Sequence, residues 1–269
     1  YNQAFDLHYA ISEAWGTVAT WQSATWEELE TEHRTNETAH HRVVGLVIET
    51  RPERITPHHA YTLRRLGCTK VQMGIQSLDE HIRKQNNRPT TNAQIQSAFE
   101  TLRLFGFKTH IHAMVNLLGA TPESDKQDYL HLVEGKPFQP DEIKLSPCVL
   151  VDGTGLCAHY QDHTWTPYSE EELIEVLVAD TCATPAFTRI SRMIRDISAP
   201  DIVAGNKKVN LRQLVENRID TEKLSTKEIR HREVSLADTD PSTLRFEIVS
   251  YETTVTTEHF LQWVTPEGK

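Results

Sequence analysis

Charged residues at the ends of apolar runs are the first candidates for chemistry in this sequence. Glu49 directly follows a nearly unbroken apolar run, and a carboxylate there is costly to bury unless a cation or hydroxyl group meets it. The ribose or amino group of a ligand would meet it, and so would Arg51 as a structural partner. Lys144 lies between Ile143 and Leu145, so its ammonium group must reach a polar cavity. The sequence leaves both readings of Glu49 open.

Histidine and cysteine spacing gives little support for a metal site. His110 and His112 share one face of a predicted strand, because side chains alternate along a strand. A third ligand for this pair is not evident, so a polar lining is the better interpretation. The four cysteines are scattered without a C-x-x-C pair, as is typical of reduced thiols in a cytosolic protein. We therefore predict no metal ligands in this chain.

The elements that must position these residues alternate between strands and helices. Strand-like apolar runs cover residues 43–48, 70–76, 108–116, 143–151 and 188–194. Helical patterns lie between them, at residues 57–66, 92–105, 123–133 and 169–182. Strands that alternate with helices form parallel sheets, and right-handed crossovers curl such units into a barrel. The predicted fold is α/β, a partial TIM-like (βα) barrel.

The carboxyl ends of barrel strands should carry the active site, because the loops there meet at one mouth. Polar residues stand at or near these ends: Glu49, Arg51, Gln76, Ser77, Asn116, Lys144, Ser146, Arg189, Arg192 and Arg195. We expect Glu49, Gln76, Asn116 and Lys144 to surround one shared cavity beside a positively charged surface.

Charge is distributed unevenly along the chain. The net charge is -10, yet residues 189–232 hold eleven Lys and Arg against six Asp and Glu. Such a local excess indicates either a polyanionic partner or a solvated helical face. No apolar run is long enough to span a membrane and no secretory leader opens the chain, so we predict a cytoplasmic protein.

The last part of the chain changes in character. Residues 244–251 and 258–264 are rich in β-branched and aromatic side chains, which predicts an antiparallel hairpin. We predict a barrel over residues 1–200, a basic linker region over 201–240 and the beginning of another domain over 241–269.

Motifs in a fixed order resemble the catalytic subunit of Elongator, in particular its bacterial forms. They include Gly45-Leu46-Val47-Ile48-Glu49-Thr50-Arg51-Pro52, Gly74-Ile75-Gln76-Ser77, Asn116-Leu117-Leu118-Gly119-Ala120-Thr121-Pro122-Glu123-Ser124-Asp125, Pro140-Asp141-Glu142-Ile143-Lys144 and Ile229-Arg230-His231-Arg232-Glu233-Val234. The resemblance covers roughly residues 37–234. It implies a barrel of radical S-adenosylmethionine type, followed by the start of a GNAT-like acetyltransferase domain.

The function that this resemblance implies is the modification of wobble uridine in tRNA. An acetyl-CoA-derived carboxymethyl precursor would be added to C5 of the base, with S-adenosylmethionine and a 4Fe-4S cluster as cofactors. The partners would be a tRNA anticodon stem-loop and either a second copy of the chain or Elongator-like subunits. Because the anticodon loop is already single-stranded, moving its base into a pocket costs little.

The resemblance also implies roles for individual residues. Glu49, Arg51, Gln76 and Asn116 would face the adenosylmethionine, and Lys144 and Tyr168 would line the reaction pocket. The tRNA backbone would contact Arg88, Arg192, Arg195, Lys207, Lys208 and Arg212.

The chain departs from the family pattern in several places. The cluster cysteines of the family would precede Tyr1, so the chain as it stands should not bind the cluster. The family's Asn-Arg-Gly-His-Thr appears as Asn87-Arg88-Pro89-Thr90-Thr91, so only Arg88 carries over. His231 stands where many members have cysteine, which leaves a zinc near it open. A radical enzyme acting on another substrate and a non-catalytic tRNA-binding scaffold remain alternative hypotheses.

Overall fold

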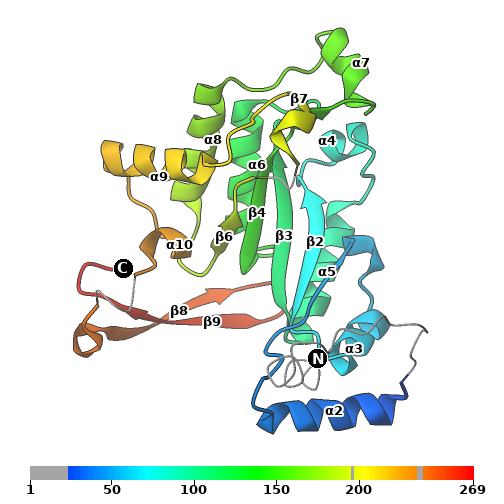
Figure 1. The fold of residues 1–269 in the computed structure, drawn as a ribbon, viewed down its shortest axis with the longest axis vertical. Coiled ribbons are helices and arrows are strands. Elements are labelled where there is room, and N and C mark those ends of the chain that lie inside the picture. The colour runs from blue at the N-terminus through cyan, green and yellow to red at the C-terminus, as the bar shows by residue number, and fades with distance from the viewer. Residues whose placement is uncertain (1–23, 195–196, 235–238) are drawn as a thin grey trace, which may run out of the picture.

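A five-stranded parallel sheet forms the centre of the structure (Figure 1), a computed structural model that describes residues 24–194, 197–234 and 239–269. Its strands are β1 (Val47–Thr50), β2 (Lys70–Gln76), β3 (Lys108–Val115), β4 (Glu142–Pro147) and β6 (Arg189–Arg192). They lie in the order β1-β2-β3-β4-β6, and every neighbouring pair is parallel. The predicted α/β fold with a parallel sheet, open as part of a barrel, is confirmed.

The two faces of the sheet differ in chemistry. Val71, Ile111 and Ile143 point to one face and are fully buried in the main core. Helices cover this face and lie behind the sheet in Figure 1: α3 (Pro57–Arg65), α5 (Asn92–Leu104), α6 (Pro122–Glu134) and α8 (Glu170–Ala183). Residues that alternate with the apolar ones, such as Gln72 and His112, point to the opposite, polar face.

Each of these four helices begins at a hydroxyl side chain. Thr56, Thr91, Thr121 and Ser169 each accept a hydrogen bond from the backbone N–H three residues further on. This contact satisfies one of the N–H groups that the first turn of a helix leaves without a partner. The helix starts are therefore encoded locally in the sequence.

Two predicted strands differ from the observed ones. Val44 is 89% exposed, and strand pairing begins only at Val47, because no neighbouring strand reaches further back. The predicted strand 143–151 is interrupted after β4, and a separate strand β5 (Leu150–Val151) pairs antiparallel with β7 (Ile202–Ala204). That pairing joins segments far apart in the sequence, so an apolar run alone does not reveal it.

The chain after β6 packs into the same core as the sheet. Helix α9 (Leu211–Glu222) lies against α8 and fully buries Leu211, Val215 and Ile219. We expected residues 201–240 to form a linker. Part of this range instead packs into the barrel core. The remaining helices are α2 (Trp26–Thr38), α4 (Glu80–Gln85), α7 (Leu156–Gln161) and α10 (Ile229–Arg232), with 3-10 turns at Pro52–Arg54, Ala199–Asp201 and Pro241–Thr243. Within the described ranges, no helix is both long and apolar enough to cross a membrane.

A hairpin of β8 (Arg245–Glu252) and β9 (Thr257–Val264) lies below the amino ends of β4 and β6 (Figure 1). Tyr251 stacks on Phe187 with the ring centroids 3.7 Å apart, which ties the hairpin to the barrel. Its other face exposes large apolar side chains, namely Phe246, Ile248, Leu261 and Trp263. The predicted hairpin is confirmed, and its membership of a GNAT-like domain stays a prediction.

Candidate functional site

The polar face of the sheet brings together side chains from four neighbouring strands. Strand pairing places Glu49 beside Gln72, His112 beside Lys144, and Lys144 beside Arg192. Because the strands are parallel, residues near their carboxyl ends gather at one edge of the sheet. The register therefore assembles a polar site without any long loop.

A cavity of about 210 Å³ lies at this edge of the polar face. Its polar lining consists of Glu49, Gln72, His112, Lys144, Ser146 and Arg192, and its apolar wall of Ile194 and Ile197. Gln72 Nε2 donates to Glu49 Oε2 at 3.2 Å, and a ring nitrogen of His112 lies 3.2 Å from the Ser146 hydroxyl. One carboxylate therefore faces two cations in a small polar cavity.

Glu49 keeps much of its contact with solvent in this arrangement. Its carboxylate is exposed, so the desolvation cost that the preceding apolar run suggested does not arise. Its side chain bonds to Gln72, while Arg51 is exposed and lies 3.7 Å from Glu53. The structure therefore shows no Glu49–Arg51 ion pair within the cavity.

A buried polar network lies below the cavity on the same face. Lys70 Nζ is 2.9 Å from both carboxylate oxygens of Glu142, and His110 lies 3.6 Å from that carboxylate and 3.0 Å from the Ser191 hydroxyl. Burial lowers the pKa of His110 to about 4, so its ring is neutral at neutral pH. His112 lines the cavity and contacts the Ser146 hydroxyl, whereas His110 lies outside the cavity lining and contacts Ser191.

Gln76 and Asn116 lie at the ends of β2 and β3 but are not among the residues that line the cavity. Both have left-handed backbones, with φ of 73° and 61°. Asn116 is 4% exposed and holds the loop before α8: its Oδ1 accepts from Tyr168 N at 2.9 Å, and its carbonyl accepts from Trp165 Nε1 at 2.9 Å. The Tyr168 hydroxyl donates to Asp125 Oδ2 at 2.8 Å. Of the four residues expected around one cavity, Glu49 and Lys144 therefore line it, whereas Gln76 and Asn116 do not.

The cations expected to contact tRNA occupy different environments. Lys207 is exposed, and Lys208 is exposed but lies 2.7 Å from Glu170. Arg212 is largely buried, donates to the Ile190 carbonyl and pairs with Glu216, and burial lowers its pKa. Arg88 lies half-exposed in the turn after α4. Arg195 lies outside the described residues.

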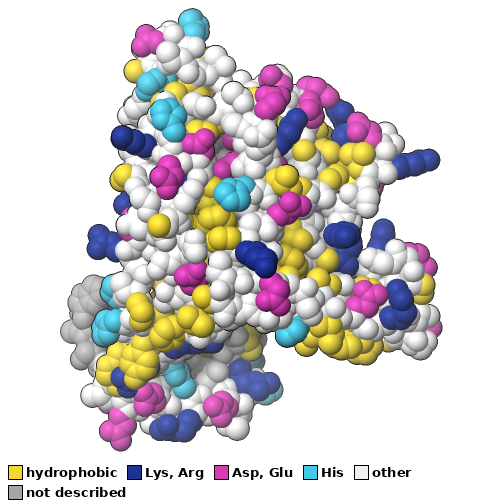
Figure 2. Space-filling view, turned by 180° about the vertical axis from the view of Figure 1, so that it is seen from behind, with side chains coloured by type: hydrophobic (Ala, Val, Ile, Leu, Met, Phe, Trp, Pro, Cys, Tyr) yellow, Lys and Arg dark blue, Asp and Glu magenta, His cyan; other side chains and the backbone are white. Residues whose placement is uncertain are grey.

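Lysine and arginine side chains are interspersed with acidic ones on the face seen from behind (Figure 2). Ion pairs consume part of the local positive excess, since Arg189 pairs with Glu233 at 2.9 Å and Arg218 with Glu171 at 2.5 Å. The count of basic residues therefore overstates the charge that remains for a partner.

The sequence reasoning missed two residues of this region. Gln72 lines the cavity, and the alternation of side chains along β2 would have placed it on the polar face with Lys70. Asp125 accepts the Tyr168 hydroxyl, but a carboxylate in the first turn of a helix usually faces solvent. No pattern in the sequence separates it from its exposed neighbours.

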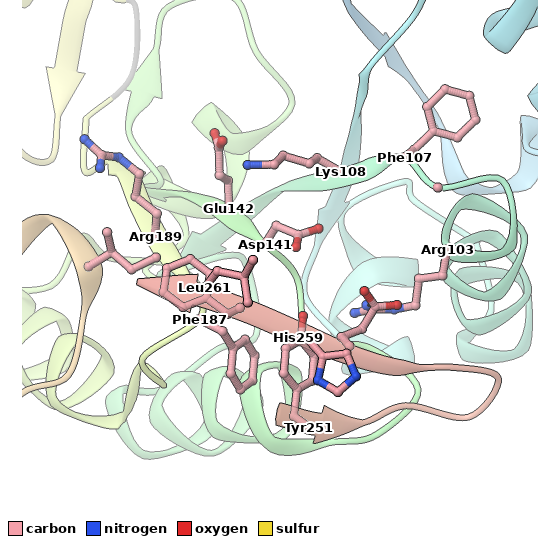
Figure 3. A pocket seen from close by; sticks show the side chains of 14 residues that line it. Arg103, Phe107, Lys108, Asp141, Glu142, Phe187, Arg189, Tyr251, His259 and Leu261 are labelled. Carbon is pink, nitrogen blue, oxygen red and sulfur yellow. The ribbon is translucent and has the colours of Figure 1, made fainter. Parts of the chain in front are cut away.

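A larger cavity of about 530 Å³ lies at the opposite, amino ends of the strands, between the sheet and the hairpin (Figure 3). Lys108, Glu142 and Arg189 line it from the barrel, and Tyr251 and His259 line it from the hairpin. Active sites of βα barrels lie at the carboxyl ends. We therefore take the smaller cavity as the candidate site.

Comparisons with known proteins agree with this architecture. A sequence model of the Radical SAM superfamily matches residues 20–131, and one of the Radical_SAM C-terminal domain matches residues 140–221. The structure of Elp3 from the archaeon Methanocaldococcus infernus, with an N-terminal deletion, superimposes with a TM-score of 0.83 at 34% identity, covering 88% of this chain and 57% of that chain. The fold, the polar mouth and these matches show that the chain belongs to the radical SAM superfamily.

Within that superfamily, the similar relatives share a narrower set of names. A tRNA uridine(34) acetyltransferase of Methanocaldococcus infernus is 34% identical over 88% of this chain and 46% of its own length. A protein of the same name from Dehalococcoides mccartyi is 37% identical over 68% of this chain and 40% of its own length. Elongator complex protein 3 of Homo sapiens is 30% identical over 73% of this chain and 36% of its own length. The chain spans less than half the length of these curated relatives.

Membership of the superfamily implies S-adenosylmethionine and a 4Fe-4S cluster as cofactors. The cavity offers a fitting donor set for the amino-acid end of adenosylmethionine, with a carboxylate for its ammonium group and two cations for its carboxylate. The described residues do not offer a comparable set of ligands for the 4Fe-4S cluster. In the part of the chain that the structure describes, no three His, Cys, Asp or Glu side chains are placed to hold a metal ion. We therefore derive no step through the cluster.

Proposed function

We propose that this chain forms the part of a tRNA wobble-uridine-modifying enzyme that holds adenosylmethionine and receives the tRNA. The observation that carries the proposal is the cavity at the carboxyl ends of the strands, where Glu49 faces Lys144 and Arg192. It is supported by the shared fold with archaeal Elp3 and by relatives named for uridine 34 of tRNA. We also propose acetyl-CoA as the acyl donor of the whole enzyme; the word acetyltransferase in the relatives' name supports only the acetyl group.

In this proposal the cavity residues bind and orient the cofactor. Glu49 accepts from the ammonium group of adenosylmethionine, and Gln72 holds the Glu49 carboxylate in place. Lys144 and Arg192 bind its carboxylate. When bound, adenosylmethionine supplies the reactive adenosyl group, and the Lys144 ammonium also remains close to the reacting substrate.

Ligand binding at the cavity is checked by equilibrium dialysis with S-adenosylhomocysteine, which keeps the amino-acid end of the cofactor. The Lys144→Glu variant replaces one of the two cations of the cavity by a carboxylate. The affinity for S-adenosylhomocysteine should fall at least tenfold, because the new carboxylate repels the carboxylate of the ligand. The matched control is Lys108→Glu, at the amino end of β3. Equal affinities of both variants and the unaltered chain would contradict the assignment.

The tRNA backbone would approach this mouth from the side of Lys207 and Lys208. These exposed lysines border a small apolar pocket that shares Ile194 and Ile197 with the candidate cavity. The Lys208–Glu170 ion pair is exposed, so a phosphate can replace Glu170 at little cost. Arg88 stays in the proposed contact surface, Arg192 is assigned to the cofactor carboxylate instead, and Arg195 lies outside the described residues. Arg212 has a structural role in this conformation, because its donors are already bonded.

Binding of tRNA should fall steeply as salt is raised, because each phosphate contact releases counterions. The test measures the affinity for an anticodon stem-loop with a wobble uridine between about 50 and 200 mM salt, a range over which several phosphate contacts lose orders of magnitude. Replacing Lys207 and Lys208 by Glu should weaken binding at low salt and flatten the slope, whereas Lys108→Glu should leave both unchanged. Flat, weak binding of the unaltered chain would end the tRNA assignment.

A further inference from the structure

Two aspartates on helix α6 hold the ends of two neighbouring strands. Asp125 Oδ2 accepts a hydrogen bond from the backbone N–H of Asn116 at 2.7 Å, directly after β3. One turn later, Asp128 accepts from the backbone N–H of Leu78 at 2.9 and 3.0 Å, shortly after β2. Residues three apart on a helix face the same side, so both carboxylates reach the sheet together.

The two N–H groups belong to segments with an uncommon backbone. Gln76 and Asn116 have positive φ angles, which residues other than glycine adopt only at some cost in free energy. Such a conformation persists where surrounding contacts enforce it. The carboxylates of Asp125 and Asp128 supply these contacts from below the sheet.

Asp125 extends the same contact to a third segment. The oxygen that accepts from Asn116 also accepts from the Tyr168 hydroxyl at 2.8 Å. Tyr168 N and Trp165 Nε1 in turn donate to Asn116. One buried carboxylate thus fixes the β3 end and the loop that carries Tyr168.

The environment of these carboxylates is tightly enclosed. Asp125 is 7% exposed, and Asp180 on α8 is 1% exposed and lines the same small space, about 10 Å³ in volume. Among the described residues, Asp180 Oδ2 has no hydrogen-bond partner. Burial raises the pKa of Asp125 to about 6 and that of Asp180 well above its usual value. The raised pKa of Asp180 favours its neutral form, which limits repulsion among the three acids.

We propose that Asp125 and Asp128 are positioning residues that fix the carboxyl ends of β2 and β3 and thereby set Gln76, Asn116 and Tyr168 at the mouth. The inference rests on the proposed function in one respect, namely that these three residues frame a ligand site. The contacts themselves do not depend on which ligand binds.

Hydrogen–deuterium exchange of the whole chain tests the proposal by separating the two contacts. Asp125→Ala should accelerate amide exchange at residues 116–118 about tenfold or more and leave residues 76–79 unchanged, because only one acceptor is lost. Asp128→Ala should do the reverse. Asp125→Asn should restore most of the protection, since its side-chain oxygen still accepts. Glu134→Gln, at the exposed end of α6, is the matched control.

A second variant keeps the test decisive if an alanine variant does not fold. Tyr168→Phe removes one hydroxyl and should accelerate exchange in the loop around residues 165–168 while residues 76–79 keep their protection. Uniform acceleration across both strand ends, or none, would overturn the positioning role. The exchange pattern requires neither tRNA nor adenosylmethionine, so failure of the proposed function would leave it unchanged.

Discussion

Asp180 is a buried side chain whose ionised form the fold does not accommodate. It is 1% exposed, lacks a partner for Oδ2 among the described residues and lies near Asp125 and Asp128. Burial therefore raises the pKa of its carboxyl far above the ordinary value of 3.8. At the scale of single residues, burial of Asp180 beside Asp125 and Asp128 favours its protonated form.

The Asp180→Asn variant should become more stable than the unaltered protein as pH rises. Below about pH 4 the carboxyl is protonated in both states, so the fold is not penalised. Above it, the unfolded chain ionises while the folded one keeps its proton, and the free energy of unfolding falls by about 1.4 kcal/mol per pH unit. Asparagine lacks this titration.

Urea unfolding at pH 4, 6 and 8 measures this difference. The gap in the free energy of unfolding between Asp180→Asn and the unaltered protein should widen with pH. Asp128→Asn is a comparison, because Asp128 is less deeply buried and its pKa, although also raised, is held down by the bond from Leu78 N. Parallel stability curves for Asp180→Asn and the unaltered protein would show that Asp180 ionises freely in the fold.

At the scale of elements, the hairpin is attached to the barrel through one of its two faces. Tyr251 stacks on Phe187, and Glu258 lies 3.5 Å from the buried Arg103 guanidinium. The opposite face carries Phe246 and Ile248, which are 49% and 55% exposed. An isolated two-stranded hairpin is only marginally stable in water, so the contacts with the barrel hold it in place.

The Tyr251→Ala variant should release the hairpin without unfolding the barrel. Loss of the stacked ring pair removes roughly 1 kcal/mol or more of local stabilisation. Cleavage by a protease within residues 245–264 should become several-fold faster, while thermal unfolding of the barrel changes little. Phe246→Ala on the exposed face is the control and should leave cleavage unchanged. If both variants are cleaved at the same rate, the stacked pair is not the anchor.

For the whole molecule, the sequence predicts the order of elements better than the shape of the mouth. Helix starts such as Ser169 and buried strand runs such as Val71–Ile75 are local signals, and the structure confirms them. Two features were not predictable. The strand Leu150–Val151 pairs with a segment distant in the sequence, and Asp125, which contacts Asn116, lies on a helix whose other polar residues give no sign of that contact. Glu49 and Lys144 share one cavity because the carboxyl ends of parallel strands meet at one edge, but Gln76 and Asn116, also expected there, are held by contacts that the sequence does not reveal.

The exposed hairpin face has a consequence for how the chain behaves at different ionic strengths. Four neighbouring apolar side chains, Phe246, Ile248, Leu261 and Trp263, stand on a hairpin that pairs with no further strand among the described residues, a surface that favours adhesion between copies. A net charge of -10 keeps copies apart when counterions are scarce, and added electrolyte screens that repulsion. Added electrolyte is therefore expected to weaken the proposed tRNA contact and to favour contact between copies, so tRNA binding should be measured at several protein concentrations.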